Sequence, residues 1–161
     1  MKKLLLIAAV IVALATPGSL WAAGSCTQTA TKDASSRFLL IKFVCTGDGA
    51  GGTAGSIPAT AISAANMALI LDKARLVSVM AYPTTGGTAP DAADVTLTMN
   101  GQDLLGGAGV NLIHATATQD VYPLNTGGDV RFPLITNTVT LGVANQATAS
   151  ANYTIEAIFG K

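Results

Sequence analysis

Residues 94–100 read DVTLTMN, and this heptapeptide alternates strictly between apolar and polar side chains. Val95, Leu97 and Met99 fall on one face of an extended chain, while Asp94 and the two threonines fall on the other. A period of two is typical of a β-strand with one buried and one solvated face. The segment therefore predicts a strand of an antiparallel sheet, with its three apolar side chains directed inward.

The same period recurs in three further segments, ARLVSVMAYP, TVTLGVANQ and NYTIEAIFG, at residues 74–83, 138–146 and 152–160. In the first, the alternation separates two faces, one with Leu76, Ser78, Met80 and Tyr82 and the other with Val77, Val79 and Ala81. In the other two, the predicted core positions are Val139, Leu141, Val143, Tyr153, Ile155, Ala157 and Phe159. The short polar loop between these last two segments, residues 146–151, predicts a C-terminal hairpin.

Two segments do not follow this period. RFLLIKFVCT, residues 37–46, is apolar on both alternating faces apart from Lys42, which predicts a strand covered on both sides. Residues 61–71 fit a short helix, and MALILD, residues 67–72, fits a strand equally well. Short strands separated by clusters of Gly, Pro, Asn and Asp are typical of a β-sandwich. The sequence therefore predicts an all-β fold, a single antiparallel β-sandwich or jelly-roll-like domain.

The start of the chain predicts export. Two lysines precede an apolar run, residues 4–15, and small residues occupy positions 22–24, the pattern of an N-terminal signal peptide. A retained membrane anchor is the alternative, but about a dozen apolar residues are fewer than the ~20 that cross a bilayer. We expect a cleaved signal peptide, residues 1–23, and one β-sandwich domain, residues 24–161, in the periplasm or outside the cell.

The charge left after this cleavage is small. Without Lys2 and Lys3, seven basic residues stand against nine acidic ones, a net charge of −2. No basic field remains that would attract nucleic acid or an anionic membrane surface. We therefore expect no nucleic-acid partner and no membrane span in the mature chain.

The mature chain holds two cysteines, Cys26 and Cys45. In an exported protein two cysteines most simply pair with each other. The bridge would close a loop of about 19 residues and stabilise the fold by about 3 kcal/mol. The alternative is lipidation of Cys26, because Ala-Gly-Ser-Cys loosely resembles a lipobox, although the branched residue usual three places before the cysteine is missing.

A first glycine-rich segment has the spacing of a dinucleotide-binding fingerprint. Gly47, Gly49 and Gly52 follow a predicted strand, and Asp72 lies twenty residues after the third glycine. The fingerprint requires a helix to begin at that glycine, so that the helix N-terminus can hold the pyrophosphate. Residues 53–58, TAGSIP, do not begin a helix, and we therefore interpret the segment as a surface loop and expect no cofactor.

A second such segment, NGQDLLGGAGVNL at residues 100–112, lacks the Gly-Lys-Ser/Thr that ends a phosphate-binding loop. We interpret it as a tight connection between strands. Asp103 is predicted to cap its turn, and Leu104 and Leu105 to plug the end of the sandwich. Positive φ angles are expected at its glycines, Gly106, Gly107 and Gly109.

The candidates for catalysis and metal binding are weak. His114, the one histidine, has Asp120 nearby in sequence, but no Gly-x-Ser-x-Gly segment supplies a nucleophile. Zinc requires three or four ligands, and both cysteines are expected to be bridged. Asp91, Asp94 and Asp103 offer at most a weak calcium site, because they lack the dense spacing of an EF-hand loop. We expect no enzyme and no metal.

Glycan binding is the remaining function to consider, since secreted β-sandwiches often bind sugars on exposed aromatic rings. Trp21, the one tryptophan, leaves with the signal peptide. The mature chain then offers Tyr82, Tyr122, Tyr153 and four phenylalanines, most of them at strand positions predicted to be core. This distribution weakens the glycan-binding interpretation.

The order of motifs in the second half of the chain resembles a family. ARLVSVMAYPTTGGTAPDAADVTLTMNGQDLLGGAGVNL is followed by TQDVYPL and VRFPLITNTVTLGVANQ. This order is similar to that in small structural proteins of tailed-phage virions, where a Thr-Ala-Pro turn precedes a strand, a glycine-rich connector and a further strand. Matching positions cover somewhat more than half of the mature chain: Thr88, Ala89, Pro90, Asp94 to Leu97, Asp103, Leu105 to Gly109, Asn111, Pro123, Leu124, Val139 to Leu141, Val143 and Asn145.

The resemblance implies an antiparallel β domain that decorates a particle or assembles into one and has no catalytic activity. The predicted signal peptide and the two cysteines depart from the virion proteins, which are made in the cytoplasm. Either a phage-type module has been adapted for export, or unrelated β-sandwiches share these motifs.

We therefore expect a secreted, non-enzymatic structural or assembly protein, acting as a homo-oligomer or within a larger protein assembly. The strand at Tyr153 to Phe159 is the expected docking edge. The alternative is a periplasmic or extracellular module that binds a glycan or another surface ligand through the glycine loops at residues 47–55 and 106–109. A hydrolase centred on His114 and Asp120 is the third hypothesis.

Export and disulfide formation are testable together by the intact mass of the secreted protein. We expect the mass of the chain without residues 1–23, lowered by the two hydrogens that a disulfide removes. An uncleaved mass would contradict the predicted signal peptide. An added lipid mass on Cys26 would contradict the disulfide and place the protein at a membrane surface.

Overall fold

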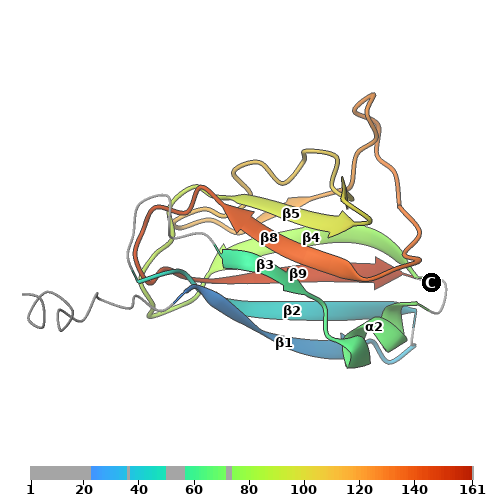
Figure 1. Cartoon of the computed structure of the whole chain (residues 1–161), viewed down its shortest axis with the longest axis horizontal. Helices are drawn as coiled ribbons and strands as arrows, with labels where there is room; N and C mark the ends of the chain where they lie inside the picture. Colours follow the sequence, from blue (N-terminus) through green and yellow to red (C-terminus); the bar gives the residue numbers. More distant parts are fainter. Residues whose placement is uncertain (1–22, 36, 50–56, 72–73, 161) are drawn as a thin grey trace, which may run out of the picture.

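The computed structural model describes residues 23–35, 37–49, 57–71 and 74–160, and residues 1–22 of the predicted signal peptide lie outside this part of the chain. Two antiparallel sheets pack face to face (Figure 1). Sheet A has the strand order β1 (Ser25–Lys32), β2 (Phe38–Thr46), β9 (Asn152–Gly160), β4 (Arg75–Pro83) and β7 (Gln119–Val121). Sheet B has the order β3 (Ile57–Ala61), β8 (Val139–Ala144), β5 (Asp94–Met99) and β6 (Gln102–Asp103). The predicted antiparallel β-sandwich is confirmed.

The core lies between the two sheets and is built from alternate residues of their strands. Sheet B contributes Val95, Leu97, Val139, Leu141 and Val143, and β9 contributes Tyr153, Ile155, Ala157 and Phe159. All of these are buried, as their alternation predicted. Met99 is an exception, because it is only partly buried at the end of β5.

The ambiguous segment forms the helix α2 (Ala64–Ile70). The Ser63 hydroxyl accepts a hydrogen bond from the Asn66 backbone N–H and caps its first turn. Met67 and Ile70, three residues apart, share the helix face that packs on the core. Over the described residues, no helix is long and apolar enough to cross a membrane.

β2 is covered on one side only. Its inward side chains, Leu39, Ile41 and Phe43, are buried, whereas Phe38 is 49% and Val44 42% exposed. The predicted strand covered on both sides is therefore wrong for a single copy of this chain. Sheet B packs against the inner face of sheet A, and the outer face carries no further layer in the described part of the molecule.

The last two strands do not form a hairpin. β8 pairs with β3 and β5 in sheet B, while β9 pairs with β2 and β4 in sheet A. The loop between them therefore crosses from one sheet to the other. An alternating strand buries the same side chains whichever sheet it joins. The pattern therefore identified the core residues but not the strands that pair with β8 and β9.

This topology also corrects the expected docking edge. β9 is the central strand of sheet A, so residues Tyr153 to Phe159 lie between two hydrogen-bonded neighbours and present no free edge.

A β-bulge corrects the predicted faces of β4. The register against β9 shifts between Leu76 and Ser78, which inserts one residue into the strand. Leu76 consequently points inward together with Val79 and Ala81, and all three are buried. The predicted grouping of Leu76 with Met80 and Tyr82 is wrong.

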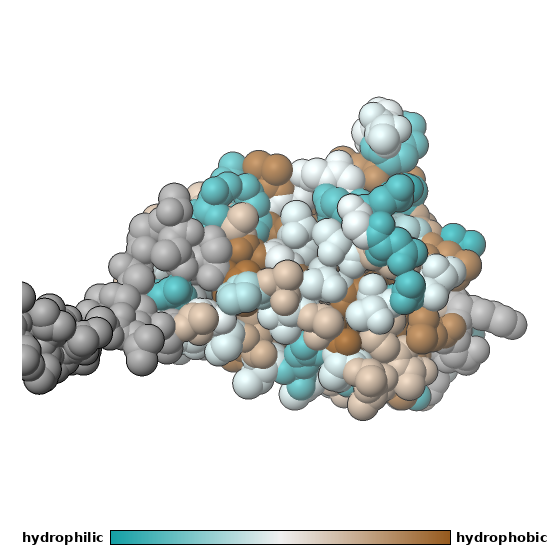
Figure 2. Space-filling model, in the orientation of Figure 1, coloured by the Kyte–Doolittle hydropathy of each residue, from teal (hydrophilic) through white to brown (hydrophobic). Residues whose placement is uncertain are grey.

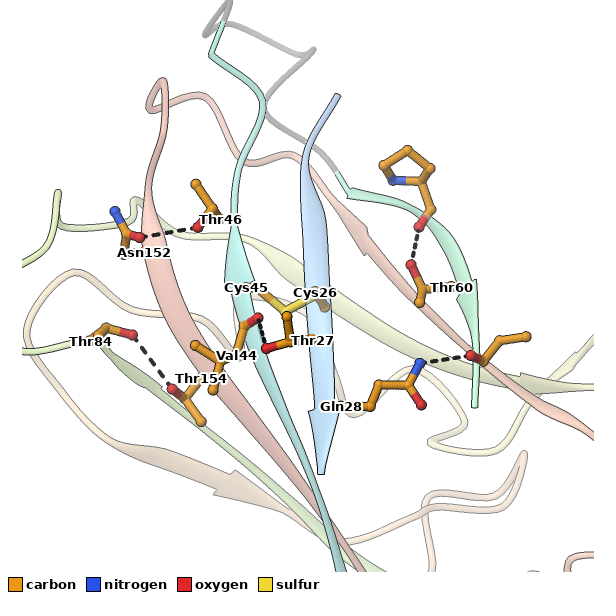
Figure 3. The surroundings of a disulfide bond; sticks show 12 residues. Cys26, Thr27, Gln28, Val44, Cys45, Thr46, Thr60, Thr84, Asn152 and Thr154 are labelled. Atoms are coloured by element: carbon orange, nitrogen blue, oxygen red, sulfur yellow. Dashed lines mark hydrogen bonds between the residues drawn. A yellow bond between two sulfur atoms is a disulfide. The ribbon is translucent and has the colours of Figure 1, made fainter. Parts of the chain in front are cut away.

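The predicted disulfide is confirmed. Cys26 and Cys45 occupy paired positions on β1 and β2 and are joined by an S–S bond of 2.05 Å (Figure 3). Gln28, two residues further along β1, reaches across to sheet B, where its Nε2 donates to the Ala61 carbonyl at 2.8 Å and its Oε1 accepts from the Ser63 N–H at 3.0 Å. The disulfide and this amide together fasten β1, which is the edge strand of sheet A.

Removing the disulfide tests its contribution to stability. We expect the double variant Cys26→Ala, Cys45→Ala to keep the β-sheet circular dichroism of the native chain. Its free energy of unfolding should fall by about 3 kcal/mol, because the unfolded chain regains the entropy of an open loop. Urea denaturation of the two proteins measures the difference. Identical denaturation midpoints would contradict this expectation.

Candidate functional site

The glycine-rich connector after β5 is held by the carboxylate of Asp103. Its Oδ1 accepts from the Leu105 N–H at 3.0 Å, and its Oδ2 accepts from the Gly107 N–H at 2.9 Å. Gly106 and Gly107 have φ angles of +61° and +87°. The side chain of Leu105 is fully buried. Both carboxylate oxygens of Asp103 thus bind the backbone of the connector.

Gly109 serves a different purpose from the one predicted, because its φ is not positive. A Cβ atom there would lie 1.9 Å from the Val95 carbonyl oxygen, so the connector can lie against β5 only if this residue has no side chain. The Val95 N–H donates to the Gly109 carbonyl at 2.8 Å. Gly109 therefore permits close backbone packing on sheet B.

His114 takes part in a turn. Its Nδ1 accepts hydrogen bonds from the backbone N–H groups of Thr116 at 3.2 Å and Ala117 at 3.1 Å. Asp120 lies on β7, opposite Met80 of β4, and the described hydrogen bonds include none between His114 and Asp120. Because Nδ1 is already bonded to the backbone, no carboxylate orients the imidazole from that side.

The aspartates considered for calcium bind backbone and amide groups instead. Asp94 accepts from the Asn111 N–H at 2.8 Å and from the Asn145 side-chain amide at 2.6 Å, and both oxygens of Asp91 accept from the Ala147 N–H. Within the described ranges, no three His, Cys, Asp or Glu side chains come together as metal ligands. Asp91, Asp94 and Asp103 are therefore not brought into one site.

The dinucleotide-like segment is described only in part. The Gly47 N–H donates to the Ala151 carbonyl at 2.7 Å, which ties the end of β2 to the start of β9. Gly52 and Asp72 lie outside the described residues.

A polar cluster lies near the loop that joins β8 to β9. The Gln146 Oε1 accepts from the backbone N–H groups of Asp91 and Thr148. The Gln146 Nε2 and the Tyr153 hydroxyl are buried, and neither has a hydrogen-bond partner among the described residues. Burial raises the pKa of Tyr153, and the nearby Asp91 carboxylate raises it further.

Three of the aromatic side chains that the sequence offered for glycan binding lie on the surface. Phe38, Tyr122 and Phe132 are 49%, 50% and 45% exposed, in contrast to the buried Tyr153. They surround two adjacent hollows of about 520 and 210 Å³ that share Phe38 and Val77. We define the outer apolar face as the exposed or partly exposed apolar residues that line these hollows, namely Phe38, Leu40, Val77, Tyr122, Phe132 and Ile158.

The segment at residues 122–134 projects from the sandwich as an arm, the orange loop at the upper right of Figure 1. A bridge between Leu124 and Val130 pairs its two halves. Val130, Phe132 and Leu134 alternate along its second half and are 55%, 45% and 43% exposed. This alternation was a signal in the sequence, although one that predicts a buried strand face.

One ion pair lies at the centre of sheet A. Lys42 Nζ is 3.8 Å from Glu156 Oε1, and the Tyr82 hydroxyl donates to the same oxygen at 2.7 Å. Burial raises the pKa of Tyr82, and its hydrogen bond to Glu156 raises it further. The two charges neutralise each other at the centre of the outer side of sheet A.

Sheet B has a different outer face, formed mainly by small residues such as Thr96, Thr98, Thr140, Gly142 and Ala144. This sheet lies in front in Figure 1, and the surface over β3, β8 and β5 is mostly pale in Figure 2. Among the described residues, the exposed large apolar side chains in sheet strands, Phe38 and Val44, both belong to sheet A, and most of the others lie on the arm.

Known proteins give no further guide to this surface. Comparison with protein-family models, curated proteins and solved structures finds no match for the chain. The resemblance to phage virion proteins accordingly rests on its sequence motifs alone.

Two glycines of the connector allow a matched test of its packing. We expect Gly109→Ala to lower the free energy of unfolding by more than about 2 kcal/mol, because its Cβ would clash with the Val95 carbonyl. Gly107→Ala should lower the free energy of unfolding by only about 1 kcal/mol. The added Cβ meets open space, so the loss comes from the positive φ angle alone. Thermal and urea denaturation measure both values. Equal losses in the two variants would contradict the close approach at Gly109.

Proposed function

We propose that this chain is a secreted, non-enzymatic structural protein that works by binding other proteins through the outer apolar face of sheet A. The observation that supports this proposal is the position of large apolar side chains, Phe38, Tyr122 and Phe132 among them, on a surface that the described part of the chain leaves uncovered. Contiguous exposed apolar patches in soluble proteins mark interaction sites. Their burial stabilises a complex by about 25 cal/mol for each Å² removed from water.

The polar side chains also favour assembly over catalysis. Asp103, Asp94, Asp91 and the Nδ1 of His114 all hold turns and loops in place. A catalytic site requires such groups to converge on a cleft and remain available to a substrate. The resemblance to virion structural proteins points in the same direction.

A ligand-binding module is the second candidate, and one observation favours it. The larger hollow, about 520 Å³, has the size of a small-molecule site and is flanked by the rings of Phe38 and Tyr122. Most of its exposed wall is apolar and includes Leu40, Val77 and Ile158, while Thr31, Lys32, Asp33, Ser78 and Glu156 also line it. Such walls suit the apolar side chains of a protein better than the hydroxyl groups of a glycan.

Sedimentation velocity of the mature chain, residues 24–161, tests the proposal. We expect the mean mass to rise with protein concentration, because the outer apolar face becomes buried between molecules. Phe38→Glu should weaken this association at least ~10-fold, a loss of about 1.4 kcal/mol. Phe38 is half exposed, so the variant should still fold.

Thr96→Glu is the matched control, since it places the same charge on the outer face of sheet B, where Thr96 is exposed. It should leave the association unchanged. A chain that stays monomeric at millimolar concentration would count against assembly from copies of itself. Binding of a glycan or lipid panel to that monomer, abolished by Phe38→Glu, would favour the second candidate.

A further inference from the structure

The middle of the outer side of sheet A is a ladder of paired residues. β2 and β9 run antiparallel, and their outward side chains face each other in register. From one end of the ladder to the other, the pairs are Phe38 with Gly160, Leu40 with Ile158, Lys42 with Glu156, and Val44 with Thr154. We propose that a second copy of this chain covers the ladder. The two copies pack face to face about a two-fold axis that lies in their interface, parallel to the strands and above the line between β2 and β9.

This inference rests on the proposed function and deepens it by naming the partner and the contacts. β2 provides the first argument. Strands with apolar residues on both faces are typically buried on both faces. The described residues cover the side with Ile41 and Phe43 and leave the side with Phe38 and Leu40 open to solvent in part. A second layer from another molecule accounts for the two-sided pattern.

The arrangement of charge provides the second argument. A two-fold axis between β2 and β9 places each residue of the ladder opposite the other member of its own pair. Lys42 then faces Glu156 of the second copy, and Glu156 faces Lys42, so that two salt bridges form from a single pair of residues. Leu40 and Ile158 likewise face each other across the interface.

Both side chains reach the outer surface of sheet A, to different extents. The Lys42 side chain is 39% exposed, whereas the Glu156 side chain is 13% exposed and lines the larger hollow. Among the described residues, the two polar contacts of the Glu156 carboxylate, from Lys42 and from the Tyr82 hydroxyl, go to its Oε1. Its Oε2 can therefore accept from Lys42 of the second copy. A ladder with one cation and one anion carries no net charge, which favours a self-complementary partner over a strongly acidic or basic one.

The size of the face provides the third argument. β1, β2, β9 and β4 have 8 or 9 residues each, so four strands about 30 Å long and about 4.8 Å apart present roughly 600 Å² in projection. The relief of the side chains and the flanking Phe132 add to this area. The total approaches the ~800 Å² per partner that a standard stable interface buries.

Charge reversal in the mature chain tests the axis directly. Lys42→Glu places a second carboxylate opposite Glu156 of an identical copy, and Glu156→Lys places two ammonium groups opposite each other. Each single variant should therefore dimerise at least ~10-fold more weakly than the native chain. An equimolar mixture of the two variants restores both salt bridges and should dimerise within about threefold of the native chain. Lys42→Glu combined with Glu156→Lys in one chain should also dimerise.

Asp120→Lys is the control on the same face. Asp120 is exposed on β7, the far edge of sheet A, beyond the strands that the axis superimposes. It should leave the dimer unchanged. A native chain that dimerises while the mixture stays monomeric would overturn the proposed axis and leave the proposed function intact. A native chain that is monomeric at all concentrations would overturn the proposed dimer and leave the proposed function to a partner other than this chain.

Chemical cross-linking of the native chain gives an answer even if a charge variant fails to fold. A carbodiimide joins a lysine to a carboxylate in direct contact, and mixing ¹⁴N- and ¹⁵N-labelled chains distinguishes links between copies from links within one. We expect a mixed-label peptide that joins Lys42 to Glu156. A cross-linked dimer without this mixed-label peptide would overturn the proposal.

Discussion

The sandwich depends on the burial of β9 between β2 and β4. Four of its side chains, Tyr153, Ile155, Ala157 and Phe159, point into the core and are almost completely buried. Its backbone is hydrogen-bonded on both sides, to β2 and to β4. The same strand sets the geometry of the outer side of sheet A, because Glu156 and Ile158 alternate with the core residues. The same strand therefore provides core residues on its inner face and part of the proposed binding surface on its outer face.

The edges of the two sheets explain why that function is assigned to a face. β1 is fastened to β2 by the disulfide and to sheet B by Gln28. β7 and β6 have only three and two residues, and β3, the other edge of sheet B, has five and accepts the Gln28 hydrogen bond at Ala61. Short or covered edges discourage strand-to-strand association. The broad side of sheet A, with Leu40, Val77 and Ile158 partly open to solvent, remains the better surface for a partner.

Much of the fold could be predicted from the period of the sequence. Val95, Leu97 and the inward residues of β8 and β9 were identified because alternation alone determines which side chains a pleated strand can bury together. The pairing of Cys26 with Cys45 followed from expected export. The partners of β8 and β9 could not be predicted, because both sheets face one core and the pattern is the same for either. The bulge at Leu76 was missed for a similar reason. An extra residue in the strand moves Leu76 to the other face of the sheet without changing the composition of the segment.

The candidate site was less predictable. The sequence marked Asp103 as a turn cap, and the structure shows its carboxylate on two backbone N–H groups. It gave no sign that Gly109 meets the Val95 carbonyl, because that contact joins segments fourteen residues apart in the chain. Phe38 was expected in the core, since it falls in a strand predicted to be covered on both sides and apolar strand residues are usually buried. The apolar residues on both faces of β2 predicted a strand buried on both sides within one chain. We attribute this pattern to burial of the outer face between two copies of the chain.

Hydroxyl-radical footprinting of the mature chain over a range of concentrations examines this attribution residue by residue. Oxidation of Phe38 and Ile158 should slow as the concentration rises, because these side chains become covered. Val110, which is 62% exposed on the connector and does not line either hollow, should be oxidised at a constant rate. Oxidation rates that do not change with concentration at any of the three residues would contradict the account.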